Sequence, residues 1–275
     1  MANHLPSDKQ AQIIAALAEC NSIRSIERQT GVHRDTIMRL GVRVGEGCQA
    51  LLDAKMRGLT SERIEVDELW GFIRMKEKTA LQTLADPECG DVWTFLAIDP
   101  QTKVIPSFLV GKRDLPHTTA FLSDLASRLA NRIQLSSDAM NAYPEAVARA
   151  FGEHIDYGQI VKRYSVTERE DQRKYSPPGL VTIRKHTVSG RPDDEKICTS
   201  YIERSNLTLR NHCKRLARLT LAFSKKLENF KAAIALNLAY YNFVKVHTTL
   251  RSTPAVAAGI ERTALTINDL LDAAA

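Results

Sequence analysis

The chain has 275 residues, of which 44% are hydrophobic and 25% are charged, as is ordinary for a globular protein with a sizeable core. It contains no apolar run long enough to span a membrane, and its first residues lack the basic and apolar segments of a secretory signal. The five cysteines are scattered without a CxxC pair, which argues against a disulfide framework or a zinc knuckle. We therefore expect a cytoplasmic protein with no membrane contact.

The net charge is +6, and the positive excess is confined to the C-terminal quarter. From Thr199 to the end there are eleven Lys or Arg residues against five Asp or Glu residues. The rest of the chain balances, with 27 residues of each sign. A localised basic excess is typical of proteins that bind nucleic acid, although a solubilising surface gives the same totals.

Residues 1–58 are predicted to form an all-α helix-turn-helix domain. A first helix begins near Ser7, and two short amphipathic helices then flank a turn at Gly31. The second of these presents a polar face to the major groove, and the residues expected to contact DNA are His33, Arg34, Thr36 and Arg39. Glu27 departs from the pattern, which usually has a small residue close to the turn, and a plain helical bundle is the alternative. A connector is expected next, because the chain then contains Gly41, Gly45, Gly47 and Gly58.

Strands and helices alternate over residues 59–246. Three strands come first, with a hairpin turn at 99–102 between the second and third. The predicted strands are 63–73, 91–99, 103–111, 132–138 and 155–164, and the predicted helices are 116–131, 144–151 and 225–246. This order is that of an α/β RNase H-like domain, a mixed five-stranded sheet with flanking helices. Residues 165–198 are expected to form an insertion, with a short strand pair at 181–183 and 186–188, and residues 247–275 a C-terminal tail.

A basic helix is predicted over residues 199–226, which contain seven basic residues, one acid and neither Gly nor Pro. At helical spacing, one face of it carries Glu203, Asn206, Arg210, Lys214 and Arg218. A carboxylate at the head of a row of cations suits a metal ion beside a phosphate backbone. We therefore expect Arg210, Lys214 and Arg218 to contact DNA, the alternative being a helix with a solvated basic face.

Three acids occupy positions where their carboxylates can meet in such a fold. Asp67 lies inside the first strand, where an unpaired Asp is costly; Asp138 ends the fourth strand, and Glu203 lies on the basic helix. The first and fourth strands are neighbours in an RNase H-like sheet, and three carboxylates can hold two divalent ions about 3.5–4 Å apart. We therefore predict Asp67, Asp138 and Glu203 as catalytic residues and as ligands of two Mg²⁺ or Mn²⁺ ions.

Each of these acids also has a structural alternative. Asp67 can pair with a buried Arg, Asp138 can cap the following helix, and Glu203 can form an ion pair with a residue one helical turn away. Two further acids are weaker candidates, because Glu68 points to the other face of its strand and Asp99 lies in the hairpin turn.

Four stretches of the chain resemble a single family of enzymes. They are residues 22–48, 66–73, 135–147 and 203–260, of which the last is the most specific. In these stretches the chain is similar to the DDE transposases of the insertion-sequence-one family. The resemblance implies an RNase H-like catalytic domain behind a helix-turn-helix, with Asp67, Asp138 and Glu203 as the acidic triad. Many relatives carry a cysteine-bearing zinc-binding segment before the helix-turn-helix, and this sequence has none.

The resemblance also implies an activity and its partners. It implies Mg²⁺-dependent cleavage of the ends of a bacterial insertion element and joining of the 3′-hydroxyls to target DNA, in the cytoplasm at the nucleoid. The partner is then double-stranded DNA, and joining two ends calls for a homo-oligomer of at least two chains. Two other functions stay open, a non-catalytic DNA-binding regulator on a transposase scaffold and an RNase H-like nuclease. The intact triad argues against the regulator, and the helix-turn-helix is less needed by the nuclease.

Overall fold

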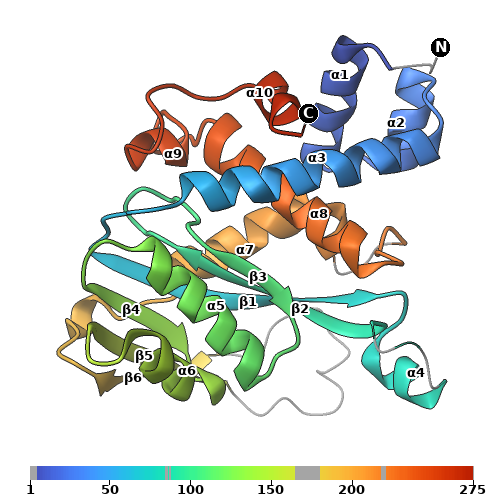
Figure 1. Ribbon diagram of the computed structural model, residues 1–275. Helices are drawn as coiled ribbons and strands as arrows, with labels where there is room; N and C mark the ends of the chain where they lie inside the picture. Colours follow the sequence, from blue (N-terminus) through green and yellow to red (C-terminus); the bar gives the residue numbers. More distant parts are fainter. Residues whose placement is uncertain (1–4, 84–85, 87, 165–179, 218–220, 275) are drawn as a thin grey trace.

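A mixed six-stranded sheet forms the centre of the computed structural model, which describes residues 5–83, 86, 88–164, 180–217 and 221–274 (Figure 1). The strands are β1 (Arg63–Ile73), β2 (Gly90–Ile98), β3 (Phe108–Gly111), β4 (Ile133–Asp138), β5 (Ile155–Tyr164) and β6 (Leu180–Ser189). Their order across the sheet is β3-β2-β1-β4-β5-β6. The pairs β1–β2, β2–β3 and β5–β6 are antiparallel, whereas β1–β4 and β4–β5 are parallel. A three-stranded meander continued by parallel strands is the RNase H-like arrangement, so the predicted fold class is confirmed, with one strand more than expected.

Helices cover both faces of this sheet (Figure 1). The α-helices of the described residues are α1 (Ser7–Ala18), α2 (Ile23–Thr30), α3 (Arg34–Lys55), α4 (Glu77–Gln82), α5 (Leu115–Arg128), α6 (Ala142–Phe151), α7 (Ser200–His212), α8 (Leu227–Ala239), α9 (Pro254–Ala257) and α10 (Ile267–Asp272). Shorter turns are η2 (Asp194–Lys196), η3 (Lys214–Leu216) and the π-helical η4 (Tyr240–Val244). None of the described helices has both the length and the apolar character needed to cross a bilayer.

The two faces of β1 belong to two different cores because side chains alternate along a strand. Ile64 and Val66 pack with α5 and α6 in one cluster, whereas Leu69 and Ile73 pack with α7 and α8 in the other. The second cluster also contains Ile37 of α3 and other residues of α1–α3. The N-terminal helices and one face of the sheet therefore share a continuous core.

The two helices predicted on either side of Gly31 are α2 and α3, and the chain turns between them at Gly31. Gly31 has φ +71°, a left-handed conformation that Gly adopts at little cost, and Ser22 caps α2 by accepting a bond from the Ser25 N–H. Glu27, the residue that departs from the usual pattern, accepts a hydrogen bond from the backbone N–H of Arg34 at 3.0 Å. Its carboxylate thus supplies an acceptor at the start of α3, where backbone N–H groups lack helical partners.

The expected connector after this motif is wrong, because α3 runs unbroken through Gly41, Gly45 and Gly47. A Cβ on Gly45 would lie 2.3 Å from the carbonyl oxygen of Ala232 in α8. A Cβ on Gly47 would lie 2.7 Å from Ala273 and Ala274 near the C-terminus. These glycines allow α3 to pass close to other backbone, so their sequence signal was for packing and not for a loop.

Two other boundaries differ from those predicted. β3 begins at Phe108 and not at residue 103, because the Ile105 backbone exchanges two hydrogen bonds, each of 3.0 Å, with the Asn242 side chain. Pro106 also has no N–H with which to extend the ladder. The expected short strand pair is the single strand β6, which pairs with β5; residues 165–179 of the expected insertion lie outside the described residues.

The long basic helix predicted over residues 199–226 is also wrong, because α7 ends at His212. Cys213 adopts an extended conformation and is buried, and η3 then turns the chain. Arg215 donates to the carbonyls of Ala222 and Phe223 at 3.3 Å, so this segment folds back on itself. The row of cations is therefore divided between α7 and η3, and Arg218 lies outside the described residues.

Candidate active site

A polar cleft of about 680 Å³ opens at the carboxyl end of β4, beside Asp67 in the middle of β1. The last backbone pair between these parallel strands is Glu65 with Ser136, and both Asp67 and Asp138 lie two residues beyond it. Glu203 reaches the same cleft from α7. The structure thus brings the three predicted acids to one cavity, which Arg113 and Lys162 also line.

The surroundings of Asp67 strongly perturb its carboxylate. Its Oδ2 accepts a hydrogen bond of 2.7 Å from Asn206 Nδ2 on α7, one turn beyond Glu203, so its partner is an amide and not the buried Arg considered above. Burial raises the pKa of Asp67 to about 7, and the neighbouring charges of Glu68, Asp138 and Glu203 add to the shift. Such a carboxylate favours any cation that can neutralise it.

Glu68 lies closer to this site than the sequence indicated. One carboxylate oxygen each of Asp67, Glu68 and Asp138 lies within 4.8 Å of the other two. The Glu68 side chain does belong to the opposite face, where it accepts bonds from Arg113 at 2.6 Å and from the buried Tyr143 hydroxyl at 3.0 Å. Strand alternation therefore gave the correct face, but a Glu side chain is long enough to bring an oxygen to the end of the sheet.

Asp138 is half exposed and remains open to the cleft. Its Oδ1 accepts a 3.0 Å bond from the Met140 N–H, and its Oδ2 is 3.9 Å from Arg113. The following helix α6 begins only at Ala142, with Asn141 at its N-cap, so Asp138 does not cap it. One oxygen of Asp138 therefore orders the turn while the other faces Arg113 and the cavity.

Glu203 is held by groups from two elements. Thr199, at the start of α7, donates to Glu203 Oε1 at 2.7 Å, and Lys162 of β5 forms an ion pair with the same oxygen. The ion pair thus comes from a neighbouring strand and not from one turn along the helix. Glu203 is about half exposed, at 48% for its side chain, so the carboxylate is accessible from the cleft.

Glu65, which is not among the residues predicted from the sequence, positions the helix that carries Glu203. The residue is 1% exposed, and its Oε2 accepts the backbone N–H groups of Tyr201 and Ile202 at 2.8 and 2.9 Å. These N–H groups belong to the first turn of α7, where a carboxylate is favourable. Burial raises the pKa of Glu65 despite these bonds. The only sequence signal was a second acid on the Asp67 face of a mostly apolar strand.

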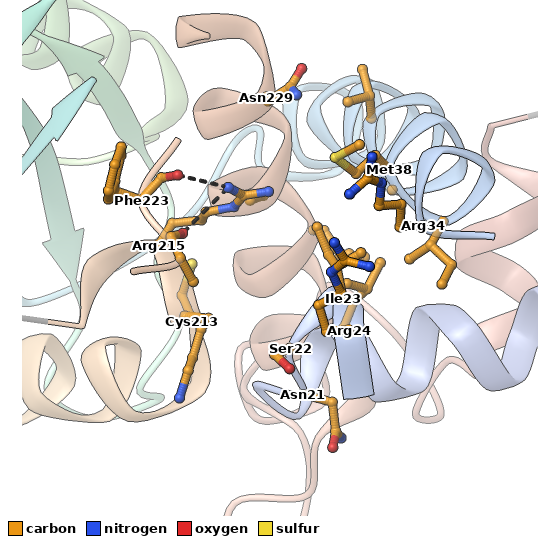
Figure 2. Close-up of a pocket in the computed structure, with 18 of the residues that line it drawn as sticks. Asn21, Ser22, Ile23, Arg24, Arg34, Met38, Cys213, Arg215, Phe223 and Asn229 are labelled. Carbon is orange, nitrogen blue, oxygen red and sulfur yellow. Dashed lines mark hydrogen bonds between the residues drawn. The ribbon is translucent and has the colours of Figure 1, made fainter. Parts of the chain in front are cut away.

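A second cleft, of about 840 Å³, lies between the helix-turn-helix and the segment that joins α7 to α8. Figure 2 shows Arg24, Arg34 and Met38 on one side of it and Arg215 and Phe223 on the other. Lys214, one of the predicted DNA contacts, also lines this cleft. The start of α3 and η3 therefore contribute side chains to the same cleft.

The remaining predicted DNA contacts fall into two groups. His33 and Arg39 are exposed on the first turns of α3, and Thr36 beside them is partly buried. Arg210 is half-buried near the end of α7, on the face that carries Glu203 and Asn206. The structure thus leaves the start of α3 accessible, whereas Arg210 lies one helical turn beyond Asn206 and is not among the residues that line the cleft of the acids.

Residues 184–244 match the model of a protein family described as IS1 transposase. The resemblance to the IS1 transposases is confirmed. The matched residues run from β6 through α7 and α8 and include Glu203. No curated protein matches the chain significantly.

Among solved structures, the chain is similar to a piggyBac transposase in a cryo-EM synaptic complex with hairpin DNA. The superposition has a TM-score of 0.42 and 9% sequence identity, and it covers 98% of this chain and 70% of that chain. The IS1 family match supports a DNA transposase, and the cleft described above contains acidic residues of the kind that hold divalent ions.

Proposed function

We propose that this protein is a DDE transposase that binds the ends of its insertion element and catalyses metal-dependent cleavage and strand transfer of DNA. The observation that carries the proposal is the convergence of Asp67, Asp138 and Glu203 on one polar cleft at the carboxyl edge of an RNase H-like sheet. The match of residues 184–244 to the IS1 transposases supports the same activity.

The donor set in the cleft fits divalent ions such as Mg²⁺ or Mn²⁺. Carboxylate oxygens are the ligands that these hard cations prefer, and one oxygen each of Asp67, Glu68 and Asp138 lies within 4.8 Å of the other two. We assign Asp67, Asp138 and Glu203 as the residues that would hold two such ions, with Glu203 contributed by α7. Bound ions would supply an activated water or 3′-hydroxyl and would neutralise charge at the scissile phosphate.

The other side chains of the cleft have supporting roles in this proposal. Asn206 holds Asp67 Oδ2 and so orients that carboxylate toward the cavity. Arg113, which contacts Glu68, faces Asp138 and lies over the Trp93 ring, keeps positive charge beside the acids. A phosphodiester entering the cleft would thus meet cationic groups at the edge of a strongly acidic centre.

The DNA is proposed to contact the start of α3 through His33, Arg34, Thr36 and Arg39, with Lys214, Arg210 and Arg218 as additional contacts. Arg34 and Lys214 line the same cleft, so one duplex can reach both. We also keep as proposals the division into a helix-turn-helix domain of residues 1–58, a catalytic domain of 59–246 and a C-terminal tail. The joining of two ends requires at least a dimer, acting in the bacterial cytoplasm.

The test uses the purified chain and DNA that carries the sequences flanking its gene. Incubation with Mg²⁺ or Mn²⁺ is expected to give nicks at defined positions, and EDTA is expected to abolish them. The Asp67→Asn variant should bind the same DNA without nicking it. Tight binding without metal-dependent nicks by the unaltered chain would favour a DNA-binding regulator. Cleavage of junctions or RNA–DNA hybrids in place of the element ends would favour a nuclease.

A further inference from the structure

Lys162 occupies the cleft but has no role in the function proposed above. It lies on β5, its side chain is 24% exposed, and its ammonium group contacts the carboxylate of Glu203. Thr199 Oγ1 lies 3.4 Å from the same ammonium and also donates to Glu203 Oε1 at 2.7 Å. Lysine and threonine therefore hold one oxygen of the third acid together.

The other acids of the cleft form a group without Glu203. Among the described residues, Asp67, Glu68 and Asp138 are the ones whose oxygens lie close enough together to share a cation. A carboxylate oxygen that neutralises an ammonium group is a poorer ligand for a divalent ion, because the two cations repel each other and compete for the same lone pairs. Glu203 Oε1, the oxygen that Lys162 contacts, is thus free to act as a ligand only when Lys162 moves away.

DNA supplies the charge that can move it. The lysine ammonium is a compact charge on a flexible chain of four methylene groups, and it binds phosphate oxygens readily. Because Lys162 lines the same cleft as the acids, a phosphodiester placed there for cleavage comes within its reach. The lysine can then exchange a carboxylate partner for a phosphate partner without leaving the cleft.

We propose, resting on the function above, that Lys162 couples DNA binding to completion of the metal site by releasing Glu203 when its ammonium group turns to a DNA phosphate. In the chain without DNA the ion pair weakens cation binding at Glu203. With DNA in the cleft, the carboxylate is free to act as a ligand. By thermodynamic reciprocity, divalent ions also strengthen DNA binding in the cleft.

The first arm of the test measures Mn²⁺ binding to the full chain without DNA, from the electron paramagnetic resonance signal of free Mn²⁺. Lys162→Gln removes the competing charge, and its Mn²⁺ affinity is expected to rise at least about fivefold, the lower end of ordinary coupling between sites. Lys162→Arg keeps the charge and should stay close to the unaltered chain. Lys185→Gln is the matched control, because Lys185 lies on β6 and contacts backbone carbonyls of η2 instead of the acids. Loss of the fold would separate the acids of the cleft and is expected to lower this affinity instead of raising it.

The second arm measures binding of a fluorescent mixed-sequence duplex at increasing salt, with EDTA present. Loss of one phosphate contact lowers the slope of log affinity against log salt by about 0.9. Lys162→Gln is expected to show this change and Lys185→Gln is not. The proposal is overturned if the Mn²⁺ affinity of Lys162→Gln does not exceed that of the unaltered chain, or if its salt slope is unchanged.

The proposed function fails by a different result. If Asp67→Asn and Asp138→Asn bind Mn²⁺ as well as the unaltered chain and nick DNA equally, the acidic cleft is not the catalytic site. If those variants lose both properties while Lys162→Gln behaves like the unaltered chain, the transposase assignment stands and only the coupling is wrong.

Discussion

Replacing Asp67 with Asn is expected to stabilise the fold while abolishing cleavage. Asn has nearly the same shape, and its side-chain oxygen can still accept the 2.7 Å bond from Asn206. It removes, however, a negative charge that is buried beside Glu68 and Asp138. The fold therefore carries a cost for this carboxylate, which is recovered when a cation binds there.

The size of the effect follows from the pKa of Asp67, raised from its ordinary 3.8 to about 7. Because the folded state holds the proton more tightly than the unfolded chain, this group favours folding least at high pH. Its contribution is fully present below about pH 4 and is lost as the pH rises to about 7. One pKa unit corresponds to about 1.4 kcal/mol, which sets a ceiling of about 4 kcal/mol. Since neighbouring acids share the titration, we expect the free energies of unfolding of Asp67→Asn and the unaltered chain to diverge by roughly 1–3 kcal/mol between about pH 5 and pH 8.

Urea unfolding of both proteins in EDTA, at a series of pH values, measures this divergence. Adding Mn²⁺ at the highest pH should stabilise the unaltered chain more than Asp67→Asn, so that the difference between their free energies of unfolding becomes smaller. The control is Asp156→Asn, which removes an acid that Arg132 holds in an exposed ion pair. The pKa of Asp156 is lowered, to about 2, so its loss should not stabilise the fold at any pH. The reasoning is refuted if the free energies of unfolding of Asp67→Asn and the unaltered chain differ by the same amount at low and at high pH.

Three further results are expected. Gly45→Ala should lower the free energy of unfolding by roughly 1–3 kcal/mol in urea, because its Cβ would overlap Ala232 of α8. Gly41→Ala is the control and should cost less, because its Cβ meets only the flexible end of Leu17, at 3.1 Å. Equal effects of the two substitutions would contradict the close crossing of α3 and α8. Glu65→Leu should lower both stability and nicking, because it removes the acceptor for the N–H groups at the start of α7. Glu65→Gln should retain most of both properties, since its amide oxygen can accept the same N–H groups. If Glu65→Gln is as impaired as Glu65→Leu, the negative charge is the essential property. Arg34→Ala should weaken binding to the element ends by about 1–3 kcal/mol if Arg34 contacts a base, and an electrophoretic binding titration measures this change. An unchanged affinity would mean that the start of α3 does not recognise the DNA.

The strands that carry the site were predictable from the sequence because their apolar residues are clustered and bounded by turn residues. β1 and β5 have the predicted limits, and the turn at Asp99 is present, with that side chain accepting bonds from Gln101 and Thr102. The register that sets Asp67 and Asp138 at one edge then follows from ordinary strand pairing. For this part, local pattern and overall fold agree.

The errors arose where tertiary contacts override a local signal. Nothing within residues 199–226 marks the end of α7 at His212, because the sequence there has neither Gly nor Pro. The break depends on burial of Cys213 in the core and on the bonds of Arg215 to the carbonyls of Ala222 and Phe223, which fold the segment back on itself. The glycines of α3 caused the opposite error, in which a helix was predicted as a connector. Gly45 is needed because the backbone of α8 lies against it, and not because the chain forms a loop there.

The position of Glu203 depends on a contact that no periodicity reveals. Its helix is fixed to β1 at two points, by Glu65 at the first turn and by the bond between Asn206 and Asp67 one turn after Glu203. Both acceptors lie on the same face of the same strand, so β1 determines where the third acid can lie. A substitution in that strand is therefore expected to move Glu203 even when Asp67 and Asp138 keep their places.

The continuous core between α3, α8 and the sheet has a consequence for where the DNA is cut. Because α3 crosses α8 with almost no space at Gly45, and α8 shares its core with β1, the start of α3 and the acidic cleft belong to one rigid unit. In the proposed function, a sequence read by α3 would then lie at a set distance from the acids of the same chain or of a partner chain. Nicks should fall at a constant spacing from the bound sequence, and Gly45→Ala, which forces α3 and α8 apart, should scatter their positions before it prevents cleavage.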